Sequence, residues 1–278
     1  MTTPSICYPL AVGNGFTRII EAGTGPAILF IHGLGARADR WRTTVERIGA
    51  LGFRAIACDL PGHGFASKEA TAPATVPAIA DYIVQVMDRL DVPSAPLVGT
   101  SLGAHIAAYA ACTAPGRVPG LVLVGALGVV PISQEVAETI SRNVRVQDKS
   151  LFENKLKFVL YDPSGITPAM IEEEWRINTF PGAGAAFGRL GDYLVNGISA
   201  DYVAGRLCAL YPPDKMLLVW GKQDRAVPPE VGEACRTALG GPELVFIDRS
   251  NHVPYLEQPE AFDAVVVPHL RRLLSGAS

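Results

Sequence analysis

The sequence has little charge of either sign. Of its 278 residues, 18% are charged, and 24 lysines and arginines stand against 27 aspartates and glutamates, a net charge of −3. A nucleic-acid surface needs a local excess of positive charge, and so does an anionic membrane surface. No such basic cluster is found, so we expect neither partner. The hydrophobic fraction of 49% instead predicts a globule with a substantial core.

Long hydrophobic runs are also missing. An apolar, uncharged run at residues 118–134 is too short to span a bilayer and is broken by Pro119, Pro131 and glycines. Residues 1–5 lack the basic start and apolar core of a secretory signal. We therefore expect a soluble, cytoplasmic protein.

Cysteine is sparse and scattered, and no C-x-x-C pair occurs. This spacing excludes a zinc knuckle and a redox dithiol, and it fits a reducing cytosol. We expect no metal and no cofactor, and we interpret the cysteines as small hydrophobic residues, two of them buried at Cys58 and Cys112. The five positions are Cys7, Cys58, Cys112, Cys208 and Cys235.

Short apolar strands alternate with helical patterns, which predicts an α/β fold with a mostly parallel, twisted sheet and helices on both faces. The helices are predicted at residues 41–51, 79–90 and 102–114. The predicted strands are residues 8–12, 17–21, 28–31, 54–58, 95–98, 121–124, 216–220 and 244–247.

The alternation stops after Val124 and resumes at Met216. We therefore predict a core domain made of residues 1–127 and 213–278, with residues 128–212 inserted as a helical cap. Such a cap would exclude water and shape an apolar substrate cavity.

Residues 99–103 read Gly-Thr-Ser-Leu-Gly and lie between a predicted strand and an alanine-rich helix. This G-x-S-x-G pattern is typical of a nucleophile elbow, a turn so tight that both glycines must lack side chains. Ser101 would then lie exposed at the apex, over the positive end of the helix.

Two further polar residues follow apolar strands in the order that a serine site requires. Asp224 comes shortly after residues 216–220, and His252 comes shortly after residues 244–247. The carboxyl ends of parallel strands meet at one edge of a sheet, so these side chains are expected near Ser101. There His252 would act as the base and Asp224 would orient it.

A glycine-flanked turn, residues 32–35, follows the predicted strand 28–31. The backbone N–H of Leu34 and that of Leu102 would form an oxyanion hole. With these four elements in order, the whole chain resembles the α/β-hydrolase superfamily. The resemblance implies a nucleophilic Ser101 that forms an acyl-enzyme.

The other candidates for these roles have simpler interpretations. We expect His32 to shape the oxyanion loop through backbone hydrogen bonds, His105 to be buried or half-buried in its helix, and His269 to lie at the surface. His63 belongs to a D-x-P-G-H-G segment that is generally structural in the superfamily. Asp248 is expected to cap a turn.

The segments 158–167 and 171–175 resemble the cap of the meta-cleavage-product hydrolases, which cut carbon–carbon bonds in ring-fission products. Three residues depart from that pattern. Thr100 replaces an asparagine, Val253 replaces an aromatic residue, and Glu174 replaces an arginine that binds the substrate carboxylate. A carboxylate beside Glu174 would be repelled. As substrate-binding residues we predict Gly33, Thr100, Trp175 and Val253.

The sequence therefore favours a carboxylesterase-like serine hydrolase of a small, largely apolar ester, thioester or lactone. Alternatives are a meta-cleavage-type carbon–carbon hydrolase, a cofactor-free perhydrolase and a slow-turnover ligand receptor on the same fold. The expected partner is a small-molecule substrate, and a homodimer is left open.

Overall fold

The computed structural model describes residues 2–275. Within them, eight strands form one sheet in the order β1-β2-β4-β3-β5-β6-β7-β8. β1 and β2 pair antiparallel, as do β2 and β4, and all the other neighbours are parallel. The strands are β1 Ile6–Val12, β2 Gly15–Ala22, β3 Ala27–Ile31, β4 Arg54–Cys58, β5 Leu97–Thr100, β6 Leu121–Val124, β7 Met216–Gly221 and β8 Glu243–Ile247.

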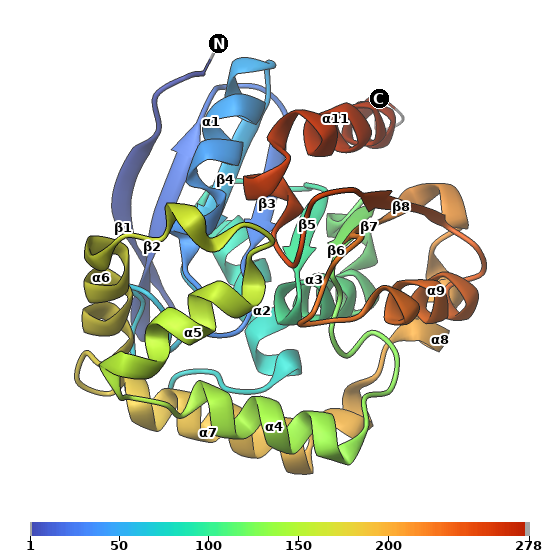
Figure 1. The fold of residues 1–278 in the computed structure, drawn as a ribbon. Coiled ribbons are helices and arrows are strands. Elements are labelled where there is room, and N and C mark those ends of the chain that lie inside the picture. Colours follow the sequence, from blue (N-terminus) through green and yellow to red (C-terminus); the bar gives the residue numbers. More distant parts are fainter. Residues whose placement is uncertain (1, 276–278) are drawn as a thin grey trace.

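Helices cover both faces of this sheet (Figure 1). The α-helices are α1 Arg42–Ala50, α2 Val76–Arg89, α3 Leu102–Thr113, α4 Gln134–Val144, α5 Lys149–Val159, α6 Pro168–Asn178, α7 Ala183–Asn196, α8 Ala204–Leu210, α9 Pro229–Ala238, α10 Pro254–Glu257 and α11 Pro259–Ser275. Short 3₁₀ helices are η1 Ala38–Trp41, η2 Pro115–Arg117, η3 Pro163–Gly165, η4 Ile198–Asp201 and η5 Pro213–Lys215. The predicted α/β fold is confirmed.

Two apolar layers hold the helices to the sheet. One cluster of buried apolar side chains packs α2, α3 and α9 against one face of the sheet. A second cluster packs α1 and α11 against the other face. The central strands β5 to β7 are buried along their whole length, as expected for parallel strands covered on both faces. α3 is buried almost all round, so its alanines allow it to lie close against the sheet.

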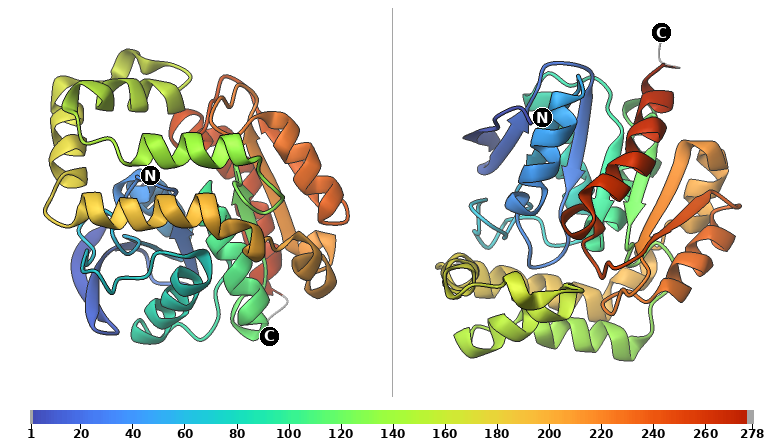
Figure 2. Two further views of the ribbon diagram at one scale, coloured as in Figure 1. Left: turned by 90° about the horizontal axis from the view of Figure 1, so that it is seen from below. Right: turned by 45° about the horizontal axis from the view of Figure 1, so that its top comes forward.

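Helices α4 to α8 lie between β6 and β7 in the chain. α4 to α7 pack across the edge where the parallel strands end (Figures 1 and 2), whereas α8 packs beside α3 and α9. α4 and α7 run side by side as the outer pair. α5 packs on α6, and Glu174 of α6 forms ion pairs with Arg37 and with Arg40 of η1. Among residues 2–275, no helix is long and apolar enough to cross a membrane.

The boundaries of α2 show what local sequence adds to hydrophobic periodicity. The apolar spacing predicts a start at Ile79, but α2 begins at Val76 because the Thr75 hydroxyl accepts a hydrogen bond from the Ala78 N–H and caps the helix. A proline in the first turn is compatible with this start.

Candidate active site

Ser101 is the single residue between β5 and α3. Its backbone has φ 56° and ψ −124°, a conformation that is strained for a residue with a side chain. Three hydrogen bonds hold it there. The Ser101 N–H donates to the Val124 carbonyl at 2.9 Å, and its own carbonyl accepts from the N–H groups of Ala104 and Leu127 at 3.0 and 3.2 Å.

The two flanking glycines are required by close backbone contacts, as the sequence predicts. A Cβ atom at Gly99 would lie 2.3 Å from the Gly103 carbonyl oxygen. A Cβ atom at Gly103 would lie 2.4 Å from the His32 carbonyl oxygen. Both distances are far inside van der Waals contact, so β3, β5 and α3 can meet here only because these side chains are missing.

His252 and Asp224 form a buried, hydrogen-bonded pair. Asp224 Oδ2 accepts a hydrogen bond from His252 Nδ1 at 2.9 Å, and Asp224 Oδ1 accepts from the N–H groups of Ala226 and Val227 at 2.8 and 2.9 Å. With the proton on Nδ1, Nε2 of the neutral imidazole is free to accept a proton. Burial opposes protonation, but the Asp224 carboxylate outweighs it and raises the pKa of His252.

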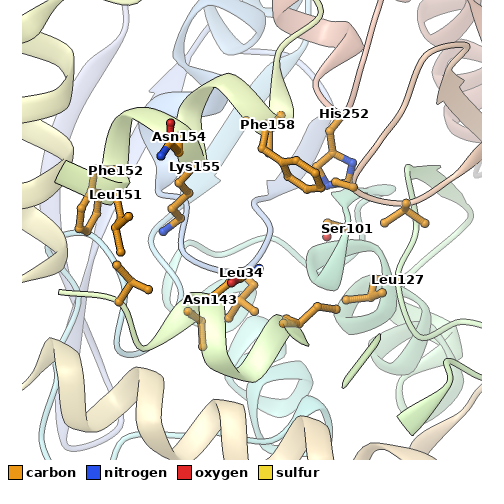
Figure 3. A pocket seen from close by; sticks show the side chains of 16 residues that line it. Leu34, Ser101, Leu127, Asn143, Leu151, Phe152, Asn154, Lys155, Phe158 and His252 are labelled. Carbon is orange, nitrogen blue, oxygen red and sulfur yellow. The ribbon is translucent and has the colours of Figure 1, made fainter. Parts of the chain in front are cut away.

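Ser101 and His252 line a cavity of about 420 Å³ between the sheet edge and α4 and α5. Figure 3 shows both at one end of the cavity, with Leu151 and Phe152 at the other. The lining is mostly apolar, which agrees with the expected cavity. It comprises Leu34, Ser101, Leu127, Ile140, Asn143, Val144, Val146, Leu151, Phe152, Asn154, Lys155, Phe158, Val159, Ala226, Val227 and His252.

A smaller space of about 80 Å³ adjoins it, and Ser101, His252 and Leu34 line both. Three residues predicted to bind substrate, Gly33, Thr100 and Val253, line this smaller space.

The two residues predicted to supply the oxyanion hole are close to Ser101: Leu102 follows it in the chain, and Leu34 lines the same two spaces. Gly33 lies so close that a Cβ atom there would be 2.9 Å from Ser101 Cβ. Leu102 is the first residue of α3, so its N–H has no partner within the helix. Within residues 2–275, neither N–H is paired with a protein acceptor.

His32 holds the loop that carries Leu34. Its Nε2 accepts from the Leu60 N–H at 3.0 Å, which leaves Nδ1 to donate to the Gly33 carbonyl at 2.8 Å. The next loop is fixed by the buried Asp59 carboxylate, which accepts from the Ala38 and Phe65 N–H groups and pairs with Arg18 at 2.8 Å. The predicted backbone-shaping role of His32 is confirmed.

The structure corrects the prediction for Trp175. Trp175 lines neither cavity that contains Ser101, and its indole N–H donates instead to the Gln147 carbonyl at 3.1 Å. One residue earlier on α6, Glu174 is the side chain that faces inward. Successive helical residues point about 100° apart, so both cannot face the site.

Glu174 does not act as the free anion that the sequence suggested. Its carboxylate pairs with Arg37 at 2.5 Å and Arg40 at 3.5 Å, and it accepts from Asn178 Nδ2 at 3.1 Å. Because this charge is compensated by two arginines, the expected repulsion of a substrate carboxylate is weakened.

The histidines outside the site are buried. His105, a buried helix residue, donates its Nε2–H to the Asp201 carbonyl at 2.8 Å. His63 is buried beside Pro61. His269, expected at the surface, is buried because it continues the inward stripe of α11 formed with Phe262 and Val266.

Sequence reasoning missed the contacts between the acid and histidine loops and α5. The Asn251 Nδ2 group donates to the Phe158 carbonyl at 2.9 Å, and the His252 N–H donates to the Val159 carbonyl at 3.2 Å. Arg225 Nη2 donates to the Leu160 carbonyl at 2.6 Å. An asparagine before the histidine was the available signal, but its partner is about 90 residues away in the chain.

In the part of the chain that the structure describes, no three His, Cys, Asp or Glu side chains gather as a metal site. The model of the alpha/beta hydrolase fold family matches residues 26–259.

Two named relatives are each 28% identical to this chain in sequence. The chain is 28% identical over 270 residues to a 2-hydroxy-6-oxononadienedioate/2-hydroxy-6-oxononatrienedioate hydrolase of Burkholderia vietnamiensis, covering 91% of this chain and 90% of that one. It is 28% identical over 251 residues to the dihydrolipoyllysine-residue acetyltransferase component of the acetoin cleaving system of Cupriavidus necator. That match covers 90% of this chain but spans only 65% of the relative's length.

A solved structure agrees in fold. The crystal structure of a membrane phospholipase A, a bacterial virulence factor, superimposes with a TM-score of 0.81 at 27% identity, covering 97% of this chain and 86% of that one.

Proposed function

The chain belongs to the alpha/beta hydrolase fold family, and from this premise we propose that it is a serine hydrolase of small, largely apolar esters, thioesters or lactones. The observation that carries the proposal is the shared cavity. Ser101 lines this cavity from a strained turn. His252, which Asp224 orients through a hydrogen bond of 2.9 Å, lines it from the loop after β8.

Each residue has a defined role in the proposed reaction. His252 Nε2 takes the proton of the Ser101 hydroxyl as the oxygen attacks the substrate carbonyl. Asp224 keeps the tautomer and stabilises the imidazolium. The N–H groups of Leu34 and Leu102 stabilise the oxyanion, and loss of such a donor costs on the order of 10²–10³ in rate.

The proton taken by His252 is then used to complete the formation of the acyl-enzyme. The tetrahedral intermediate collapses, His252 gives its proton to the leaving group, and Ser101 is left as an acyl ester. Water then loses a proton to His252 as its oxygen attacks the acyl carbonyl. Collapse of this second tetrahedral intermediate releases the acid, and His252 returns the proton to the Ser101 oxygen. Helices α4 and α5 cover the cavity, and we propose that they exclude bulk water from it.

A fluorophosphonate probe tests the nucleophile. By intact-mass measurement, we expect one phosphonyl group, the probe mass less HF, on the wild-type protein, none on Ser101→Ala and little on His252→Ala. Unchanged labelling of Ser101→Ala would refute the assignment. A parallel assay of 4-nitrophenyl esters of rising acyl length should show turnover on the order of 10 s⁻¹. Release orders of magnitude slower would favour the ligand-receptor reading.

A carbon–carbon bond hydrolase is the second candidate. Two observations favour it: the named relative from Burkholderia vietnamiensis, and the pairing of Glu174 with Arg37, which weakens the expected repulsion of an acidic substrate. An assay of a ring-fission dienoate beside the esters separates the two candidates. If the protein cleaves the dienoate more efficiently than the esters, the carbon–carbon hydrolase proposal replaces the ester proposal.

A further inference from the structure

A charged side chain lies inside the apolar cavity. Lys155 projects from α5 and lines both the large and the small space that contain Ser101 (Figure 3). Its neighbours along the large cavity are mostly aliphatic and aromatic, and its Nζ atom lies 5.3 Å from the Phe152 ring centroid. Neither the proposed proton transfers nor the oxyanion contacts use this group.

Lys155 lacks a direct counter-ion. Its one hydrogen bond within residues 2–275 is a contact of 3.5 Å with the Gly35 carbonyl, at the limit of bonding distance, and no carboxylate there forms an ion pair with it. An ammonium has three donors and is costly to bury unpaired. Burial lowers the pKa of Lys155, and the Glu174 carboxylate only partly offsets this shift.

Glu174, the acidic residue that lines the smaller space, is already engaged. One carboxylate oxygen faces Arg37 and Arg40, and the other accepts from Asn178. Lys155 therefore keeps free donors even though an acid lies close by.

The chain fixes this ammonium relative to Ser101. The last carbonyls of α5 accept hydrogen bonds from the His252 backbone, from Asn251 and from Arg225, so α5 is joined to the acid and histidine loops. Lys155 also contacts the loop after β3. A Cβ atom at Gly35, in this loop, would lie 2.7 Å from Lys155 Nζ. A glycine at that position leaves room for the ammonium next to the Leu34 loop.

We propose that Lys155 binds a carboxylate on the acyl part of the substrate. In the proposed reaction the leaving group must face His252, which protonates it. Lys155 lies away from His252, toward Phe152 (Figure 3), so a group that reaches it belongs to the acyl chain. The preferred substrates are then esters or thioesters of dicarboxylic acids, apolar in the middle and anionic at the far end.

This inference rests on the proposed serine-hydrolase function, and matched ester pairs test it. We compare mono-4-nitrophenyl esters of succinate, glutarate and adipate with neutral 4-nitrophenyl esters of the same acyl length. The wild type should have the higher kcat/KM for one of the anionic members. Lys155→Met should lower that anionic-to-neutral ratio about 10- to 100-fold, the range expected for a hydrogen bond to a charged group, and Lys155→Arg should keep most of it.

Lys157→Met is the matched control, because Lys157 is on the same helix but is exposed and paired with Glu153 at 2.7 Å. It should leave the ratio unchanged. A wild type that prefers the neutral esters overturns the inference, and so does an equal loss on both esters in Lys155→Met, which would mark Lys155 as structural.

Fluorophosphonate labelling of the same samples separates the two proposals. Labelled protein without an anionic preference refutes the Lys155 site alone, whereas unlabelled wild type refutes the serine-hydrolase function and this site with it. As a measurement independent of turnover, glutarate binding to Ser101→Ala, followed by calorimetry, should weaken by a similar factor when Lys155→Met is added. Equal binding to the two proteins contradicts the proposal.

Discussion

The backbone N–H of His252 donates a hydrogen bond to the Val159 carbonyl at 3.2 Å. This bond joins the loop of the proposed base directly to the last residue of α5. The inserted helices and the sheet core therefore meet at the proposed reaction centre itself. Because of this bond, we expect a displacement of the end of α5 to move the His252 backbone as well.

Asn251→Ala should loosen this junction. Asn251 accepts from the Arg225 N–H at 2.8 Å and donates to the Phe158 carbonyl at 2.9 Å, so the change removes two hydrogen bonds worth about 1 kcal/mol each. We expect faster amide hydrogen exchange in α5 and kcat/KM lower by about 10-fold. Asn196→Ala, which removes one exposed bond on α7, is the control. Unchanged exchange in α5 would show that the junction does not hold the helix.

Gly125→Ala should reduce activity by crowding the acid–base pair. Gly125 has φ 49°, and a Cβ atom there would lie 3.1 Å from both Asp224 Oδ2 and His252 Nδ1. The strained backbone costs on the order of 1 kcal/mol, and the displaced imidazole should lower kcat by about 10- to 100-fold. Gly205→Ala, where no atom lies within 4 Å of the new Cβ, should keep wild-type kcat. Wild-type kcat in Gly125→Ala would contradict the observed packing.

The pH dependence of activity follows from the sign of the His252 shift. Only the neutral imidazole can take the Ser101 proton, and pairing with Asp224 raises the pKa of His252 despite its burial. The acid limb of kcat/KM should therefore lie above the ordinary histidine value of about 6.5. In Asp224→Asn, burial still lowers the His252 pKa while the charge and hydrogen bond of Asp224 that raised it are gone, so the pKa measured by NMR should fall. An unshifted or raised value would mean that Asp224 does not set it.

The same shift gives a stability term with a definite direction. A histidine pKa that is raised in the folded state stabilises the fold below the unfolded pKa, and this term is lost as pH rises through the folded value.

Asp59→Asn should destabilise the loops that support the oxyanion turn. Asp59 is buried, pairs with Arg18 and accepts from the N–H groups of Ala38 and Phe65. Removing its charge leaves Arg18 without one of its partners, which should cost about 3 kcal/mol in urea unfolding. Asp88→Asn, on the exposed pair with Arg117, should cost less than about 1 kcal/mol. Similar losses for the two variants would contradict the buried-network interpretation.

The order and placement of the proposed triad could be predicted because they depend on local patterns. Each of Ser101, Asp224 and His252 follows a short apolar strand, and parallel strands end at one edge of a sheet. The glycines at 99 and 103 were predictable for the same reason, since the turn itself requires them.

Contacts between the inserted helices and the core could not be predicted this way. Lys155 faces the cavity, and Glu174 faces Arg37, only because α5 and α6 pack on the loop after β3. The sequence places these partners more than 100 residues apart. Trp175 was misplaced because it belongs to the cap segment that resembles the meta-cleavage-product hydrolases, and that resemblance does not fix the rotation of α6. The inward stripe that buries His269, in contrast, was readable from the spacing in α11.

The most direct test of the central claim is a rapid-quench experiment with a 4-nitrophenyl ester, followed by intact-mass and peptide mapping. We predict a burst of 4-nitrophenol and a transient acyl group on the peptide that contains Ser101. Neither should occur in Ser101→Ala. A burst with no acyl group on that peptide, or turnover that persists at the wild-type rate in Ser101→Ala, would contradict a nucleophilic Ser101.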